Sequence, residues 1–135
     1  MNKFKSQLHL TPEKNIIIRN LTSNDINQIA KARICQEIEN GNGASSIYIE
    51  NYKKVLTQLF NNNKLIATGA FKEDELISLA FFNLLHYGKK QLLPYLCGVW
   101  TKPSERGKGL SSLVNSHLLK ETQKLRFIFT AICYA

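Results

Sequence analysis

Cysteine is scarce in this sequence, and its number and spacing argue against a small protein stabilised by disulfides or by zinc. The 135 residues include three cysteines, Cys35, Cys97 and Cys133, and three histidines. An odd number of cysteines set among apolar residues does not make a disulfide framework, and no pair has the Cys-x-x-Cys spacing of a zinc site. The histidines are scattered as well, so we expect no metal site and three buried, structural cysteines.

Long apolar segments are also absent. The N-terminal stretch MNKFKSQLHLTPEK is polar and has no apolar core of the kind that a secretory signal needs. No apolar run reaches the roughly 20 residues that span a bilayer. Internal repeats and low-complexity segments are missing too. We therefore expect a protein of the reducing cytoplasm with no membrane segment.

Composition and charge fit a soluble globular protein of one domain, residues 1–135, in which residues 1–14 form a loose leader. The hydrophobic fraction is 44% and the net charge is +8. A chain of this length can form a stable hydrophobic core without disulfide or metal cross-links. The basic excess is partly concentrated in residues 91–135. Such a surface suits nucleic acid, an anionic cofactor or simple solubility, so charge alone does not decide the function.

Hydrophobic periodicity predicts an α/β chain in the order β-α-α-β-β-β-α-β. The charged stretch 72–75 is typical of a hairpin turn, and Pro94 is expected to interrupt the fourth strand early. A short strand is also expected near residues 8–10 and a turn at 88–90. The main strands are predicted at 16–18, 65–71, 76–85, 92–101 and 126–134, and the helices at about 26–34, 45–60 and 110–125.

The stretch GVWTKPSERGKGLSSLV, which begins at Gly98, has the features of an anion site. It lies where a predicted strand gives way to a helix, whose first amides have no helical partner. Gly107 and Gly109 remove side chains from the approach, Arg106 and Lys108 add movable positive charge, and two serines add hydroxyl donors. These are the parts of a diphosphate cradle, although a solvated turn before an ordinary helix cap would read similarly. The spacing is neither that of a Walker loop nor that of a Rossmann loop.

The segment from Val99 to Ser111, VWTKPSERGKGLS, resembles the acyl-CoA-binding motif of the GNAT superfamily of N-acyltransferases. The core pattern of that motif is Arg/Gln-x-x-Gly-x-Gly/Ala. Arg106 and Gly109 match it, and Ser111 stands where the pattern has its second small residue. The order of elements upstream is similar to that family over nearly the whole chain, so the resemblance implies a mixed, largely antiparallel GNAT-like sheet flanked by helices.

The resemblance implies an N-acetyltransferase that moves an acetyl group from acetyl-CoA to a primary amine of a small or peptide acceptor. Backbone groups of the fourth strand would contact pantetheine, the glycine loop would hold the pyrophosphate, and the thioester would lie between the fourth and fifth strands. The residues that it assigns to the cosubstrate are Val99, Trp100, Thr101, Arg106, Gly107, Lys108, Gly109, Leu110 and Ser111.

The general base stays unassigned. Histone-acetylating members of the superfamily carry a glutamate on the fourth strand, and the corresponding position here is Tyr95, which is not a carboxylate. His86, the acidic turn 73–75 and, as a nucleophile, Cys97 are further candidates. Sequence alone cannot test their reach to a substrate.

Members of the superfamily usually continue past the fifth strand with another helix and two strands, which this sequence lacks. The apolar strand 126–134 would then expose an edge, and we expect self-association, as a homo-oligomer, or another intermolecular strand pairing through it. Two other functions remain open: a CoA-binding module without turnover, and a basic nucleic-acid-binding domain. The second is disfavoured because Lys102, Arg106 and Lys108 cluster on one loop without interleaved aromatic residues.

Overall fold

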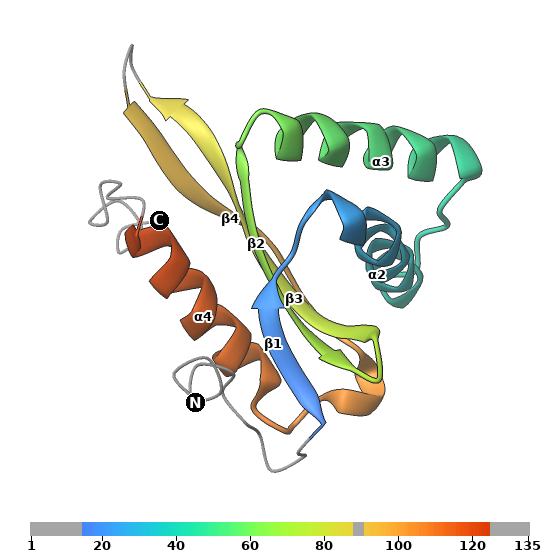
Figure 1. Cartoon of the computed structure of the whole chain (residues 1–135). Coiled ribbons are helices and arrows are strands. Elements are labelled where there is room, and N and C mark those ends of the chain that lie inside the picture. The colour runs from blue at the N-terminus through green and yellow to red at the C-terminus, as the bar shows by residue number, and fades with distance from the viewer. Residues whose placement is uncertain (1–14, 88–90, 125–135) are drawn as a thin grey trace.

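Four strands and three α-helices make up the computed structural model, which describes residues 15–87 and 91–124 (Figure 1). The leader 1–14, the short strand near 8–10, the turn at 88–90 and the strand 126–134 all lie outside the described residues. The elements are β1 (Ile16–Asn20), the 3₁₀ turn η1 (Ser23–Asp25), α2 (Ile26–Glu39), α3 (Ser46–Asn61), β2 (Leu65–Lys72), β3 (Glu75–Tyr87), β4 (Gln91–Thr101), the 3₁₀ turn η2 (Pro103–Glu105) and α4 (Leu110–Lys124).

The described sheet is wholly antiparallel, with strand order β1-β2-β3-β4. This confirms the predicted order of the first seven elements, whereas the strand that would make the sheet mixed lies beyond the described part. The expected break at Pro94 is wrong: β4 runs through it, with Pro94 opposite Leu84. Within the described sheet β4 is an edge strand, and proline, which has no N–H to donate, is tolerated on such a strand.

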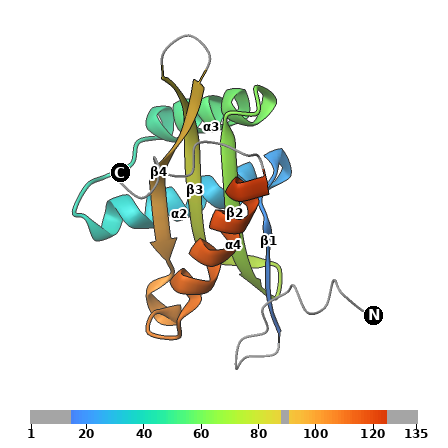
Figure 2. The same ribbon diagram turned by 90° about the vertical axis from the view of Figure 1, so that its left-hand side faces the viewer.

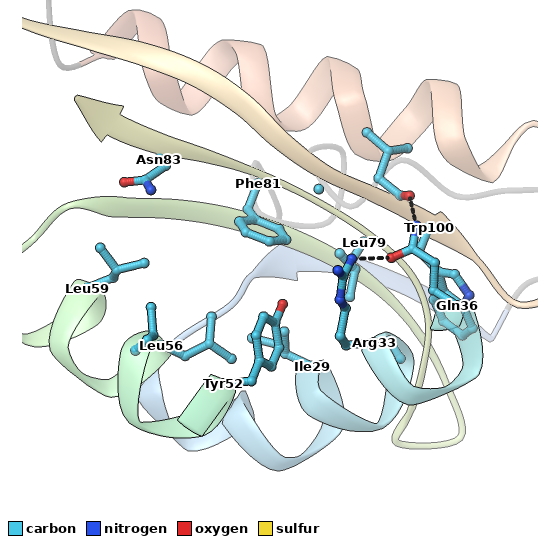
Figure 3. A pocket seen from close by; sticks show the side chains of 14 residues that line it. Ile29, Arg33, Gln36, Tyr52, Leu56, Leu59, Leu79, Phe81, Asn83 and Trp100 are labelled. Carbon is cyan, nitrogen blue, oxygen red and sulfur yellow. Dashed lines mark hydrogen bonds between the residues drawn. The ribbon is translucent and has the colours of Figure 1, made fainter. Parts of the chain in front are cut away.

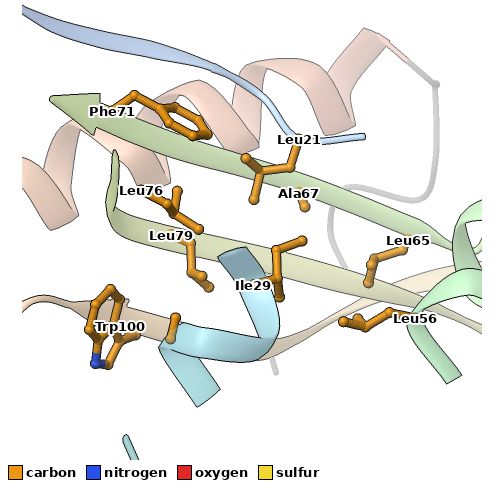
Figure 4. Packing of buried hydrophobic residues seen from close by; sticks show 10 residues of the cluster. Leu21, Ile29, Leu56, Leu65, Ala67, Phe71, Leu76, Leu79 and Trp100 are labelled. Atoms are coloured by element: carbon orange, nitrogen blue, oxygen red, sulfur yellow. The ribbon is translucent and has the colours of Figure 1, made fainter. Parts of the chain in front are cut away.

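The helices cover both faces of the sheet. In Figure 1, α2 and α3 lie on one side and α4 on the other, and Figure 2 shows α4 crossing in front of the strands. Each interface has its own apolar core. The core under α2 and α3 includes Leu21, Ile29, Leu56, Leu79 and Trp100 (Figure 4), and the core under α4 includes Ile16, Ile18, Ile77, Val114 and Leu118.

Local sequence explains where α3 begins and where the hairpin between β2 and β3 turns. Ser45 caps α3 by accepting the amide of Tyr48 at 3.1 Å. The predicted hairpin turn is confirmed: Glu73 and Asp74 have φ of 51° and 66° and form a two-residue loop between β2 and β3. None of the helices in the described part of the chain is both long and apolar enough to cross a membrane.

Candidate functional site

The loop between β4 and α4 exposes its backbone at two glycines. Gly107 and Gly109 both have φ of +81°, and no atom lies within 4 Å of the position that a Cβ would take on either of them. Only glycine adopts this left-handed conformation without strain. Both predicted glycines therefore lie where another molecule can approach the main chain closely.

The first turn of α4 points unpartnered amides at the same place. The first backbone bond beyond the loop runs from the Leu113 N–H to the Gly109 carbonyl, at 3.2 Å. The amides of Leu110, Ser111 and Ser112 precede that bond, so they have no partner within the helix. With the positive end of the helix dipole, they form a site suited to an anion.

Arg106 is held in place by two other elements instead of moving freely. Its Nε donates to the Thr101 carbonyl at 2.9 Å, and its Nη2 lies 2.8 Å from the Glu39 carboxylate at the end of α2. At the position where the sequence predicts a movable cation, the structure engages the guanidinium with both partners. The guanidinium instead fastens the start of the loop to β4 and α2.

A buried carboxylate lies beneath the loop. Glu105 is only 9% exposed, and its oxygens lie 3.1 Å from Lys108 Nζ and 3.6 Å from Lys72 Nζ. Lys108, like Arg106, is thus paired with a carboxylate. The positive charge that the loop offers to a bound phosphate is reduced accordingly.

The edge of β4 that faces away from β3 presents main-chain groups at alternate residues. The Lys102 N–H donates to the Ile77 carbonyl at 2.8 Å, and the register places Thr101 opposite Ser78 and Val99 opposite Ala80. Antiparallel pairing alternates, so the N–H and C=O groups of Val99 and Thr101 point away from β3.

Trp100 differs from its two neighbours. Its peptide groups face β3, and its side chain is buried in the core under α2 and α3 (Figure 4), where the indole Nε1 has no hydrogen-bond partner among the described residues. Of the three strand residues expected to offer backbone groups at the edge, Val99 and Thr101 do so and Trp100 does not.

A β-bulge lies directly before this edge. Phe81 is opposite Gly98 and Phe82 is opposite Leu96, so Cys97 is the extra residue on β4. A bulge bends its strand and increases the local twist. Here the bend turns the segment from Gly98 onward relative to the earlier half of β4.

A slot of about 250 Å³ lies between the two helices and the strands, next to that edge (Figure 3). Its walls are mostly apolar, and Val99 belongs both to the slot and to the edge of β4. The lining residues come from α2 (Ile29, Ala32, Arg33 and Gln36), α3 (Tyr52, Val55, Leu56 and Leu59), β3 (Leu79, Phe81 and Asn83) and β4 (Gly98, Val99 and Trp100).

A chain of hydrogen bonds crosses the mouth of the slot. Arg33 Nε donates to the Tyr48 hydroxyl at 2.9 Å, and Arg33 Nη1 donates to Gln36 Oε1 at 3.1 Å. Gln36 Nε2 then donates to the Val99 carbonyl at 3.3 Å. The hydrogen bond to Tyr48 raises the pKa of the Arg33 guanidinium above its ordinary value, so this group stays charged.

The structure assigns no general base from the predicted candidates. The acidic turn 73–75 lies in the β2–β3 hairpin and is not part of the slot, and Glu75 forms a 2.9 Å ion pair with Lys102, whose pKa it raises. Tyr95 is opposite Asn83 in the β3–β4 register, and His86 is opposite Leu92. Among the described residues, no three His, Cys, Asp or Glu side chains lie close enough together to hold a metal ion.

The slot itself was missed by sequence reasoning. Arg33 falls within the helical repeat of apolar residues that predicted α2. A charged residue on the core-facing side of a helix is the sequence feature that could have indicated a binding site there. Gln36 and Asn83 carried no such signal, because their place in the slot depends on how α2, α3 and the strands pack together.

Known structures resemble this fold over most of its length. A predicted acetyltransferase from Clostridium acetobutylicum, solved with acetyl-CoA, matches with a TM-score of 0.73 and 18% identity over 83% of this chain and 76% of its own. A GCN5-related N-acetyltransferase from Ralstonia eutropha matches with a TM-score of 0.69 and 11% identity, over 83% and 78% of the two chains.

A third match has a known amine ligand. The aminoglycoside acetyltransferase meta-AAC0020, from an uncultured soil metagenomic sample and solved with sisomicin, has a TM-score of 0.67 and 16% identity over 84% of this chain and 73% of its own. No protein-family model and no curated protein matches the sequence. The described fold is therefore that of the GNAT N-acetyltransferases.

Proposed function

We propose that this chain is an N-acetyltransferase that uses acetyl-CoA as its acyl donor and a primary amine as its acceptor. The observation that carries the proposal is the position of Val99. Its outward-facing peptide groups belong to the strand edge that leads to the glycine loop, and the same residue lines the slot. A thioester on that edge would lie beside an amine in the slot.

The donor half of the site would hold acetyl-CoA through main-chain groups. The open amides from Gly107 to Ser111 would bind the pyrophosphate, and Gly107 and Gly109 leave room for it. Pantetheine would run along the edge of β4 beside Thr101 and Val99. The support is that the structural neighbour from Clostridium acetobutylicum was solved with acetyl-CoA.

The reaction needs no covalent enzyme intermediate. The amine nitrogen attacks the thioester carbon, the carbon–sulfur bond breaks, the CoA thiolate takes up a proton, and the new amide nitrogen loses one. A backbone N–H such as that of Val99 can stabilise the negative charge that develops on the carbonyl oxygen. The largest contribution of the protein would be to hold the two substrates together.

The pairing of the loop cations favours this function over nucleic-acid binding. Lys102, Arg106 and Lys108 each form an ion pair with a carboxylate, so the loop is less basic than its sequence suggests. Binding to a phosphate chain depends on cations that release counterions when they meet phosphate. A compact main-chain cradle suits a single diphosphate better.

Thermal unfolding with CoA tests the donor site. CoA at a hundredfold excess over its Kd should stabilise the fold by about 2.7 kcal/mol, a shift of several degrees. Gly109→Glu should abolish the shift, because its carboxylate would occupy the phosphate position and would strain a residue with positive φ. Gly41→Glu is the matched control: Gly41 also has φ of +81° and open space at its Cβ position, but it follows α2.

Release of CoA thiol from acetyl-CoA in the presence of amines then tests turnover. Thiol release that depends on an amine supports the enzyme. A CoA-dependent thermal shift without any amine-dependent release would identify a CoA-binding module instead. No thermal shift, together with salt-dependent binding to arbitrary DNA, would overturn both.

A further inference from the structure

The geometry points to a small acceptor that carries a peptide α-amino group, an apolar side chain and a carboxylate, of the size of a dipeptide, with Arg33 as the carboxylate-binding residue. This inference rests on the proposed function and names its substrate class. It concerns the slot between α2, α3 and the strands, which Figure 3 shows from close by.

The size and walls of the slot favour a small, partly apolar molecule. Its volume of about 250 Å³ lies just below the roughly 300–1,000 Å³ typical of ligand pockets. Ile29, Leu56, Leu79 and Phe81 supply apolar surface from three elements. The enclosed apolar part of this space suits a dipeptide with an aliphatic or aromatic side chain better than it suits the polar rings of an aminoglycoside.

The described lining of the slot offers no carboxylate to a polycation, and its charged residue, Arg33, is already paired with Glu37 at 3.3 Å. Arg33 is the only charged lining residue among those that the structure describes. Recognition of a polyamine or an aminoglycoside would need carboxylates to pair with its ammonium groups, since burying an unpaired cation is strongly unfavourable.

Arg33 has hydrogen-bond donors left for a ligand. A guanidinium carries five N–H groups, and its three contacts, to Tyr48 through Nε, to Gln36 through Nη1 and to Glu37 through Nη2 at 3.3 Å, use one group on each nitrogen. Each terminal nitrogen thus keeps a second N–H, so two donors remain for the carboxylate of a ligand. Figure 3 shows the guanidinium between Tyr52 and Gln36, pointing from α2 toward the strands.

The lack of an acidic base points to an amine of low pKa. The α-amino group of a peptide titrates near pH 7.7–8.0 and is about one-third neutral at pH 7.5, whereas a lysine-like amine with a pKa of about 10.4 is only about 0.1% neutral. The neutral amine is the nucleophile. A slot whose described lining has no carboxylate therefore suits the α-amine of a peptide, which needs little help to lose its proton.

Paired acceptors test the carboxylate directly. Leucyl-leucine, its C-terminal amide, spermidine and sisomicin are compared in amine-dependent thiol release and, separately, in binding to the CoA-loaded protein by calorimetry. We expect the KM and the Kd of the dipeptide acid to be at least tenfold lower than those of the amide, with spermidine and sisomicin weaker still. The binding readout does not require turnover.

Three variants locate the effect. Arg33→Gln should raise the KM of the acid about tenfold more than that of the amide, and Arg33→Lys should recover only part of the difference because lysine lacks the planar guanidinium. Glu37→Gln is the matched control: it breaks the same ion pair but keeps the guanidinium, so the KM of the acid should stay equal or fall.

Several outcomes would overturn the inference. These are equal binding of acid and amide, better use of spermidine or sisomicin than of the acid, and equal effects of Arg33→Gln on both forms of the dipeptide. A rise in KM with Glu37→Gln as large as that with Arg33→Gln would reduce Arg33 to a structural role. Failure of acetyl-CoA itself to bind would instead refute the proposed function, so the two failures are distinguishable.

Discussion

The guanidinium of Arg106 bridges the Glu39 carboxylate at 2.8 Å and the Thr101 carbonyl at 2.9 Å. Glu39 is the last residue of α2, the helix that carries Arg33 and Gln36 into the slot. The bridge thus joins the helix that lines the proposed acceptor site to the loop that forms the proposed donor site. The two contacts are made by two different nitrogens of the planar guanidinium, Nε to Thr101 and Nη2 to Glu39.

Arg106→Lys should weaken CoA binding nearly as much as Arg106→Met, by about three- to tenfold. Lysine keeps the positive charge but has no second nitrogen with which to hold Glu39 and the Thr101 carbonyl together. Glu39→Gln should also weaken binding, although it removes a negative charge near the phosphates. Calorimetric titration with CoA measures all three. Wild-type affinity in Arg106→Lys, or tighter binding in Glu39→Gln, would show that only charge matters at this position.

Glu105→Gln should have the opposite effect on CoA affinity. The Glu105 carboxylate lies under the phosphate loop, so its removal frees Lys108 from an ion pair and reduces repulsion of the diphosphate. We expect CoA to bind about two- to fivefold more tightly at low ionic strength, with the gain lost at high salt because of screening. Glu121→Gln, farther along α4, is the control. An affinity that does not change at low salt would contradict the prediction.

Local sequence was sufficient to predict most of the described elements. The isoleucines that begin β1, the helical repeats of α2 and α3, and the acidic two-residue turn each depend on neighbours in the chain, so periodicity and turn chemistry report them directly. The glycine loop could also be predicted, because the end of a strand, two glycines and the start of a helix occur in one short stretch.

Contacts between segments that are distant in the sequence could not be predicted. The partner of Arg106 is Glu39, which belongs to α2, and the outward direction of Val99 and Thr101 depends on the β3–β4 register. A single sequence gives neither the register nor the packing of α2 against β4. For the same reason it missed Gln36, which meets the Val99 carbonyl only after the sheet and the helix have come together.

Gly98→Ala should destabilise the fold by about 1–3 kcal/mol, because a Cβ at this position would overlap the Phe81 ring, with Cζ only 2.5 Å away. Phe81→Leu in the same chain should relieve the overlap, so the double variant should be more stable than the sum of the single variants predicts. Denaturant unfolding measures this coupling. Gly43→Ala, with open space around it, serves as the control. Additive effects would contradict the proposed overlap.

Asp25 holds the 3₁₀ turn η1, directly before α2, through three hydrogen bonds. Its carboxylate accepts from Arg19 Nη1 and Nη2, both at 3.0 Å, and from the Thr22 N–H at 2.8 Å. Burial alone would raise the pKa of this carboxyl, but the hydrogen bonds from Arg19 and Thr22 outweigh it and hold the pKa below its ordinary value. The charged form is therefore the one that stabilises the fold.

Asp25→Asn should lower the free energy of unfolding by about 1–2 kcal/mol at pH 7, since a cap and a charge-assisted pair are weakened. A folded-state pKa below the unfolded value means that this contribution is complete above the unfolded pKa, near pH 4, and is lost as the pH falls through the folded value. The stability gap between wild type and variant should thus be constant from pH 7 to about pH 5 and close in stronger acid, as measured by urea unfolding at each pH. Asp74→Asn, in the hairpin turn, should show no such gap. A gap that persists unchanged at low pH would mean that the shape of the Asp25 side chain, and not its charge, secures the helix.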